Sequence, residues 1–129
     1  MAYEFQQIQI IKFIVLLFIP ILFLTSCNDN VNRSFHIDSV KSETIDTIFF
    51  DSTMLVVGMN ILIKSDVVGE FQIDFQDGDS YNFTQKFQNK TDTSFYIEWY
   101  TSTVSVHYRP DSNLQGQSVD MIFSPHILY

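Results

Sequence analysis

Three aspartates that lie close together are the first residues whose types and spacing could hold a metal ion. Asp74, Asp77 and Asp79 surround a glycine in the stretch DFQDGDSYN. Carboxylate oxygens around a glycine turn suit calcium, but the spacing of an EF-hand loop and its closing glutamate are missing. Asp and Gly also supply the geometry of tight turns. We therefore interpret the stretch as a hairpin turn that pairs Phe75 with Tyr81, and we predict no metal site and no cofactor.

Histidines, serines and glycines are present, but they lack the spacing of a metal site, a nucleophilic serine or a phosphate-binding loop. His36, His107 and His126 lie far apart and show no metal-ligand spacing. There is no Gly-x-Ser-x-Gly stretch that would expose a nucleophilic serine, and the four glycines form no phosphate-binding loop. The carboxylate pair of a glycosidase is defined by a separation in space, which sequence does not give. We predict that the protein is not an enzyme, and a catalytic site assembled from distant loops remains an alternative.

Two tyrosines flank a carboxylate in the stretch FYIEWY: Tyr96, Glu98 and Tyr100. Successive side chains of a strand point to opposite faces. The apolar members of the run therefore share the other face: Phe95, Ile97 and Trp99. Exposed tyrosines are enriched where proteins bind their partners. We predict that Tyr96, Glu98 and Tyr100 form a contact strip for a protein or a sugar. The alternative is ordinary cross-strand packing on a sheet surface.

The charge balance excludes two classes of partner. The chain of 129 residues has 7 Lys and Arg against 15 Asp and Glu, a formal net charge of −8. This acidity argues against nucleic acid and against electrostatic docking on anionic lipid, which needs a basic cluster. The length supports one domain, and a lone cysteine cannot form an internal disulfide.

That single cysteine, Cys27, directly follows the most apolar part of the chain. A polar start that carries Lys12 is followed by residues 13–24, which are apolar apart from one proline, and then by Thr25 and Ser26. This order is typical of a secretory signal peptide. The apolar run is short for a membrane span, which needs about 20 residues. An uncleaved membrane anchor with an incidental free cysteine is the alternative.

The stretch Leu24-Thr25-Ser26-Cys27 resembles the lipobox of bacterial lipoproteins. The resemblance covers residues 1–27. It implies that residues 1–26 are removed, that Cys27 receives a diacylglycerol thioether, and that its new amino group is acylated. Two or three acyl chains hold a protein stably on a membrane. We therefore expect a lipid-anchored protein of the Gram-negative cell envelope, with the outer membrane favoured and the domain in the periplasm or at the cell surface.

The remaining chain predicts a short tether and one all-β domain. Residues 27–34 comprise the lipidated cysteine and a polar, flexible segment. Residues 35–129 show apolar residues at every second position, most clearly in residues 71–76, with turn residues between the runs. The pattern predicts an antiparallel, immunoglobulin-like β-sandwich of seven or eight strands with Trp99 in its core. Residues 54–63 are nearly all apolar, which predicts a central strand covered on both faces or, alternatively, a short buried helix.

These features favour a non-catalytic binding or accessory module that presents a β-sandwich at a membrane. Its partners would be the membrane, through the acyl chains on Cys27, and an envelope protein. A small-molecule or glycan-binding lipoprotein is the main alternative, because such a protein needs only a pocket with a few convergent polar groups.

Overall fold

The computed structural model describes residues 31–78 and 81–129, so the signal segment and Cys27 lie outside the described residues. The described chain contains eight strands and no helix. They are β1 (Arg33–Ile37), β2 (Thr44–Phe49), β3 (Leu55–Ser65), β4 (Glu70–Gln76), β5 (Asn82–Gln88), β6 (Thr91–Ile97), β7 (Thr103–Pro110) and β8 (Val119–Leu128). The prediction of an all-β domain with seven or eight strands is confirmed.

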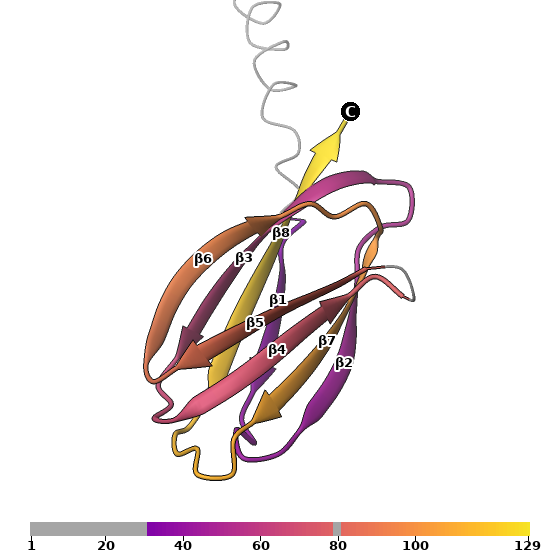
Figure 1. The fold of residues 1–129 in the computed structure, drawn as a ribbon. Helices are drawn as coiled ribbons and strands as arrows, with labels where there is room; N and C mark the ends of the chain where they lie inside the picture. Colours follow the sequence, from indigo (N-terminus) through magenta and orange to yellow (C-terminus); the bar gives the residue numbers. More distant parts are fainter. Residues whose placement is uncertain (1–30, 79–80) are drawn as a thin grey trace, which may run out of the picture. The chain divides into compact units, whose positions relative to one another are not determined.

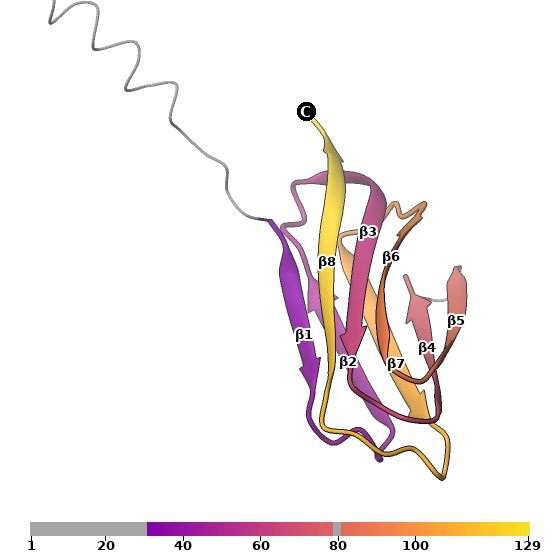
Figure 2. The ribbon, with the colours of Figure 1, turned by 90° about the vertical axis from the view of Figure 1, so that its left-hand side faces the viewer.

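The strands form two antiparallel sheets of four that pack face to face (Figures 1 and 2). Sheet A has the order β1-β8-β3-β6, and sheet B has the order β2-β7-β4-β5. The pairs β1–β8, β2–β7, β3–β6 and β4–β5 are nested, as if one long hairpin had been wrapped into a sandwich. This is the order of a jelly roll, which joins two Greek keys of antiparallel strands.

The finer prediction of an immunoglobulin-like arrangement is corrected by this strand order. Several sequence neighbours pair within one sheet of an immunoglobulin domain. Here β4–β5 is the one pair of described strands that are neighbours both in sequence and in a sheet. The other connections cross from one sheet to the other, so long-range pairing, which periodicity does not report, determines the topology.

The core lies between the inner faces of the two sheets. In β3, Met59, Ile61 and Ile63 are fully buried, while Asn60 and Lys64 on the opposite face are exposed. The strand is central in sheet A, as predicted, and the helical alternative is wrong. The prediction that both of its faces are covered is also wrong, because no further layer lies over the outer face of sheet A within the described chain.

The buried apolar residues of β4, β5 and β6, and Trp99 after them, stand at odd-numbered positions, whereas those of β7 stand at even-numbered positions. A crossover between the two sheets explains this change. The chain leaves sheet A at Ile97 and enters sheet B at Thr103. Trp99 lies in this connection with 1 % of its surface exposed. Its indole Nε1 donates a hydrogen bond of 3.0 Å to the backbone oxygen of Thr103. The prediction of a buried Trp99 is confirmed, and the indole fixes the crossover to the core.

In the β4–β5 hairpin the apolar side chains lie on the predicted face, but the predicted pairing of Phe75 with Tyr81 is wrong. Phe75 pairs with Phe83, two residues beyond Tyr81. The shift by two residues leaves both phenylalanines on the inner face, because side chains alternate with period two. The Asp77 carboxylate accepts a 2.9 Å hydrogen bond from the backbone N–H of Tyr81. Asp77 is therefore a turn residue, as interpreted, whereas Asp79 lies outside the described residues.

Candidate functional site

The outer face of sheet B carries a buried carboxylate, Asp74 in β4. Its residue surface is 1 % exposed because neighbouring polar side chains cover it. Gln72 Nε2 and Thr84 Oγ1 donate hydrogen bonds of 2.9 and 2.8 Å to Asp74 Oδ1, and Arg109 Nη2 donates to Oδ2. Asp74 lies at an outward-facing position of β4, and its carboxylate accepts hydrogen bonds from side chains of β4, β5 and β7.

These contacts keep Asp74 ionised. Burial by itself raises the pKa of this carboxyl, but donors that favour its charged form outweigh burial. They are Thr84 and Gln72, followed by the charges of Arg109 and His107, and together they hold the pKa of Asp74 below its usual range. Its oxygens are engaged in structural hydrogen bonds, so Asp74 positions Arg109 and is unsuited to act as a general acid.

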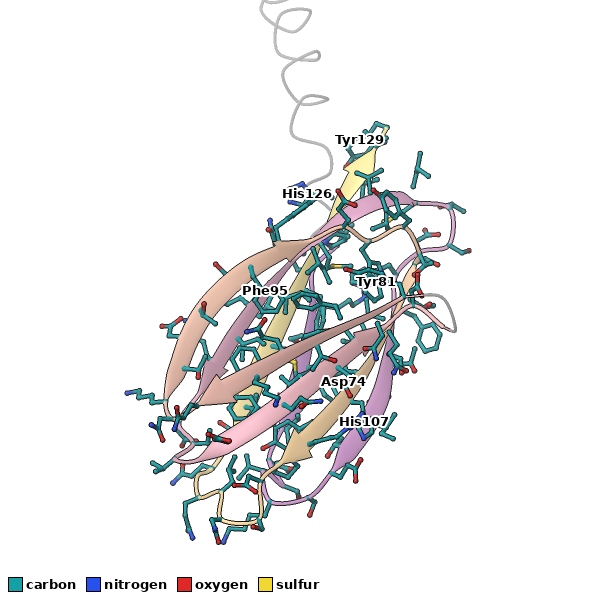
Figure 3. The ribbon with its side chains drawn as sticks, in the orientation of Figure 1. Asp74, Tyr81, Phe95, His107, His126 and Tyr129 are labelled. Carbon is teal, nitrogen blue, oxygen red and sulfur yellow. The ribbon has the colours of Figure 1, made fainter. Side chains whose placement is uncertain are left out.

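A histidine lies beside this carboxylate. His107 of β7 is opposite Asp74 in the strand register, and Figure 3 shows the two side chains next to each other on the outer face of sheet B. The ring Nε2 of His107 contacts the Glu43 carboxylate, which comes from the segment before β2. The fold therefore brings four charged or ionisable groups onto one face: Glu43, Asp74, His107 and Arg109.

A shallow groove of about 450 Å³ lies next to this network. Its lining comes from the start of β4 and the ends of β5 and β7: Glu70, Phe71, Gln72, Lys86, Phe87, Gln88, Arg109, Pro110 and Asp111. Two carboxylates and two cations surround it, so its formal charge balances. Phe71 and Phe87 are buried, and their rings stack at 5.0 Å beneath the sheet surface. The groove therefore offers a ligand both hydrogen-bonding groups and apolar surface.

Arg109 links the buried network to the groove. Its side chain is 48 % exposed, although one nitrogen is engaged with Asp74. A guanidinium carries five N–H donors, so donors remain for a ligand while the Asp74 contact limits the side chain's freedom. The sequence alone did not indicate a role for Arg109, Gln72 or Lys86. Each of them lies at a polar position of a strand in which polar and apolar residues alternate. That alternation shows which face a side chain is on, and it does not show which strands are adjacent.

The predicted strip is exposed at one end of sheet A. Tyr96 is the penultimate residue of the edge strand β6, and Glu98 and Tyr100 follow in the crossover. Tyr96 is 52 % exposed and Tyr100 67 % exposed. The Tyr100 hydroxyl donates a 3.4 Å hydrogen bond to Glu98 Oε2, and the charge of Glu98 raises the pKa of Tyr100. The three residues lie outside the core as predicted, and their role in binding stays a prediction.

Tyr96 also has a packing role that the sequence did not indicate. Its ring covers Gly58 at the irregular register of β3, where a Cβ atom would lie 1.9 Å from the tyrosine hydroxyl. The ring also meets His126 edge-on, with centroids 5.2 Å apart. The His126 Nε2 is 2.8 Å from Asn60 Nδ2, an amide nitrogen that donates hydrogen bonds. The cross-strand packing alternative therefore describes part of the role of Tyr96.

The three histidines have separate partners. His36 Nδ1 lies 2.5 Å from the Asp120 carboxylate, which raises the pKa of the histidine, while His107 and His126 occupy the two clusters already described. Within residues 31–78 and 81–129, no group of three or more His, Cys, Asp or Glu side chains is placed to hold a metal ion. In the same part of the chain, no helix is long and apolar enough to cross a membrane.

Comparisons with known proteins concern the fold alone. No family model and no curated protein matches the sequence. Solved structures with similar folds include the CENP-C cupin domain of Drosophila melanogaster, with a TM-score of 0.41 and 9 % identity over 79 % of this chain and 65 % of that one. CBM4 has a TM-score of 0.41 and 12 % identity over 65 % of this chain and 61 % of its own. TmCBM61 in complex with β-1,4-galactotriose has a TM-score of 0.34 and 8 % identity over 80 % and 86 % of the two chains.

Proposed function

We propose that this protein is a lipid-anchored, non-catalytic binding module of the bacterial cell envelope. Its anchor would be Cys27, and its jelly-roll domain would hold a binding surface at the membrane. The observation that carries the binding function is the groove on sheet B, where Arg109 is positioned by a buried carboxylate. Prepositioned donors bind a ligand with a smaller loss of side-chain entropy.

The chemistry of the groove favours a polar ligand with little net charge. Glu70 and Asp111 offset Lys86 and Arg109, so neither an anion nor a cation has an electrostatic advantage there. The amide groups of Gln72 and Gln88 can donate and accept at once. A sugar chain presents hydroxyl groups that do the same, so we propose an envelope glycan as the ligand.

Binding can be tested with the purified lipoprotein in detergent micelles on an array of bacterial cell-wall and outer-membrane glycans. A glycan retained there is then titrated by calorimetry. The double variant Lys86→Ala/Gln88→Ala should weaken binding by about tenfold, because each lost hydrogen bond contributes about 0.5–1.5 kcal/mol. Lys64→Ala, an exposed lysine on the other sheet, is the matched control. Equal losses in both variants, or no retained glycan, would contradict the groove as a glycan site.

A second candidate function uses the strip of Tyr96, Glu98 and Tyr100 as a contact for a protein of the envelope. Its support is that both tyrosines are more than half exposed. A Tyr100→Ala variant that loses a partner cross-linked to wild type in intact cells, while Lys86→Ala/Gln88→Ala keeps it, would favour this function over the groove.

A further inference from the structure

Exposed apolar side chains gather at one end of the sandwich. Ten large hydrophobic residues of the described chain are exposed. Five of them occupy the end of sheet A at which β1 begins and β8 finishes: Leu55, Tyr96, Tyr100, Leu128 and Tyr129. We call this end the entry end and these five residues the apolar rim. Figures 1 and 2 show the start of β3, the end of β6 and the end of β8 together there.

Sheet B adds further apolar side chains to the same end. Phe49 closes β2 and Tyr81 precedes β5, and they are 65 % and 41 % exposed. All lysines of the described residues lie toward the opposite end or the middle of strands: Lys41, Lys64, Lys86 and Lys90. Exposed apolar side chains gathered in this way mark a surface that contacts something apolar. Arg33 is the one Lys or Arg of the described residues at this end, where it donates to the Phe49 carbonyl. Glu98 adds a negative charge beside Tyr100, so attraction to anionic groups does not drive the contact.

The length of chain before β1 restricts what can cover the rim. Six residue steps separate Cys27 from Arg33, which is at most about 22 Å of fully extended chain. Arg33 pairs with Phe123 of β8, and Leu128 lies five residues further along that strand, about 17 Å away. β1 runs away from the entry end, and Arg33 is its first residue. When β8 stands upright with this end toward the lipid, an acylated Cys27 therefore keeps Leu128 within about 5 Å of the membrane.

We propose that the apolar rim rests in the interfacial layer of the bilayer into which the acyl chains of Cys27 insert. This inference rests on the proposed anchoring at Cys27, and it competes with the second candidate function, which gives Tyr96 and Tyr100 to a protein partner. Tyrosine is enriched at the headgroup level of membranes because its ring is apolar and its hydroxyl is polar. Tyr96, Tyr100 and Tyr129 provide such groups, and Leu55 and Leu128, paired across β3 and β8, provide the aliphatic contact.

This contact would orient the domain. The groove is lined by the start of β4 and the ends of β5 and β7, which lie at the end of sheet B opposite the entry end (Figure 1). With the rim on the lipid, the groove faces away from the membrane and stays open to ligands. The acyl chains hold the protein, and the rim fixes its orientation.

The test uses the full lipoprotein, purified after processing and reconstituted into liposomes of neutral phospholipid. Cys27 is blocked by its thioether, so a new cysteine can be labelled alone. Leu55→Cys on the rim and Val68→Cys at the far end are matched, since Leu55 and Val68 are 60 % and 62 % exposed. Each carries an environment-sensitive fluorophore, and phospholipids with a spin label near the headgroup act as quencher. We expect severalfold stronger quenching at position 55 than at position 68.

The results distinguish failure of the anchor at Cys27 from failure of the contact between the rim and the lipid. Intact mass without acyl chains on Cys27 would overturn the proposed anchoring itself. Acylated protein with equal quenching at the two positions would overturn the rim contact while leaving the anchor intact. Quenching at position 55 that disappears in 1 M salt would show docking through charge, and quenching that disappears when the protein is diluted in lipid would show that a second copy covers the rim. Either result would also overturn the proposal.

A second variant excludes insertion caused by the fluorophore. With the label at Leu128→Cys, the substitution Tyr100→Ser removes one rim tyrosine without adding charge. Quenching should fall by severalfold relative to the labelled parent, while the melting temperature stays unchanged because Tyr100 is 67 % exposed. Unchanged quenching would mean that the label, rather than the rim, enters the lipid, and the proposal would be wrong.

Discussion

Asp74 allows the sharpest test of how this sheet is held together. The variant Asp74→Ala removes an acceptor that serves Gln72, Thr84 and Arg109. Hydrogen bonds to a charged group contribute roughly 1.5–3 kcal/mol each. The loss is smaller here than that sum, because the 48 % exposed Arg109 regains water when its partner is removed. We expect the free energy of unfolding to fall by about 2–4 kcal/mol.

Urea unfolding followed by the fluorescence of the single tryptophan measures this change. Asp92→Ala, an exposed carboxylate on β6, is the matched control and should change stability by no more than about 0.5 kcal/mol. A loss below about 1 kcal/mol for Asp74→Ala, comparable to one neutral hydrogen bond, would refute the view that the buried carboxylate organises the outer face of sheet B.

The pH dependence gives a second readout of the same group. The folded-state pKa of Asp74 is lowered, so its contribution is complete above the unfolded value near 3.8 and is lost as the pH falls through the lower folded value. The stability difference between wild type and Asp74→Asn should therefore be constant above about pH 5 and shrink below pH 4. If the stability difference between wild type and Asp74→Asn grew as the pH fell, the folded protein would favour the protonated form of Asp74, and the reasoning would be wrong.

Four further outcomes follow from the sequence and the structure. Cys27→Ser should abolish incorporation of a fatty-acid analogue in cells, and equal labelling of the variant would contradict the lipobox interpretation. Trp99→Ala should lower the free energy of unfolding by roughly 3–5 kcal/mol in a urea titration, far more than an exposed tyrosine does. Tyr108→Phe should cost about 1–3 kcal/mol by leaving a buried carbonyl unpaired. Burial raises the pKa of Tyr108 to about 12, so the parent should also lose stability above about pH 10, where the variant loses less. Gly58→Ala should destabilise the parent more than it destabilises a Tyr96→Ala variant, because the added methyl group displaces the Tyr96 ring, and a double-mutant cycle with no coupling would contradict this contact.

The pattern along the chain was sufficient to predict the class of fold and the faces of its strands. Alternation with period two places one set of side chains inside, and this holds for Ile73 and Phe75 of β4, which are fully buried. Burial of a sheet face depends on the local alternation of apolar and polar residues. The proposed acylation of Cys27 stays a prediction from the sequence, because processing enzymes act on a short local motif.

Strand order and the polar site could not be predicted in the same way. Asp74 occupies a polar position of an alternating strand, which by itself indicates a solvated side chain. Its burial arises because β7 and β5 lie on either side of β4 and bring Arg109, 35 residues away, onto the carboxylate. Pairing between distant strands depends on the closure of long loops and on the packing of the whole core. Local periodicity therefore determined which residues point outward, whereas only the tertiary structure decided which of them meet.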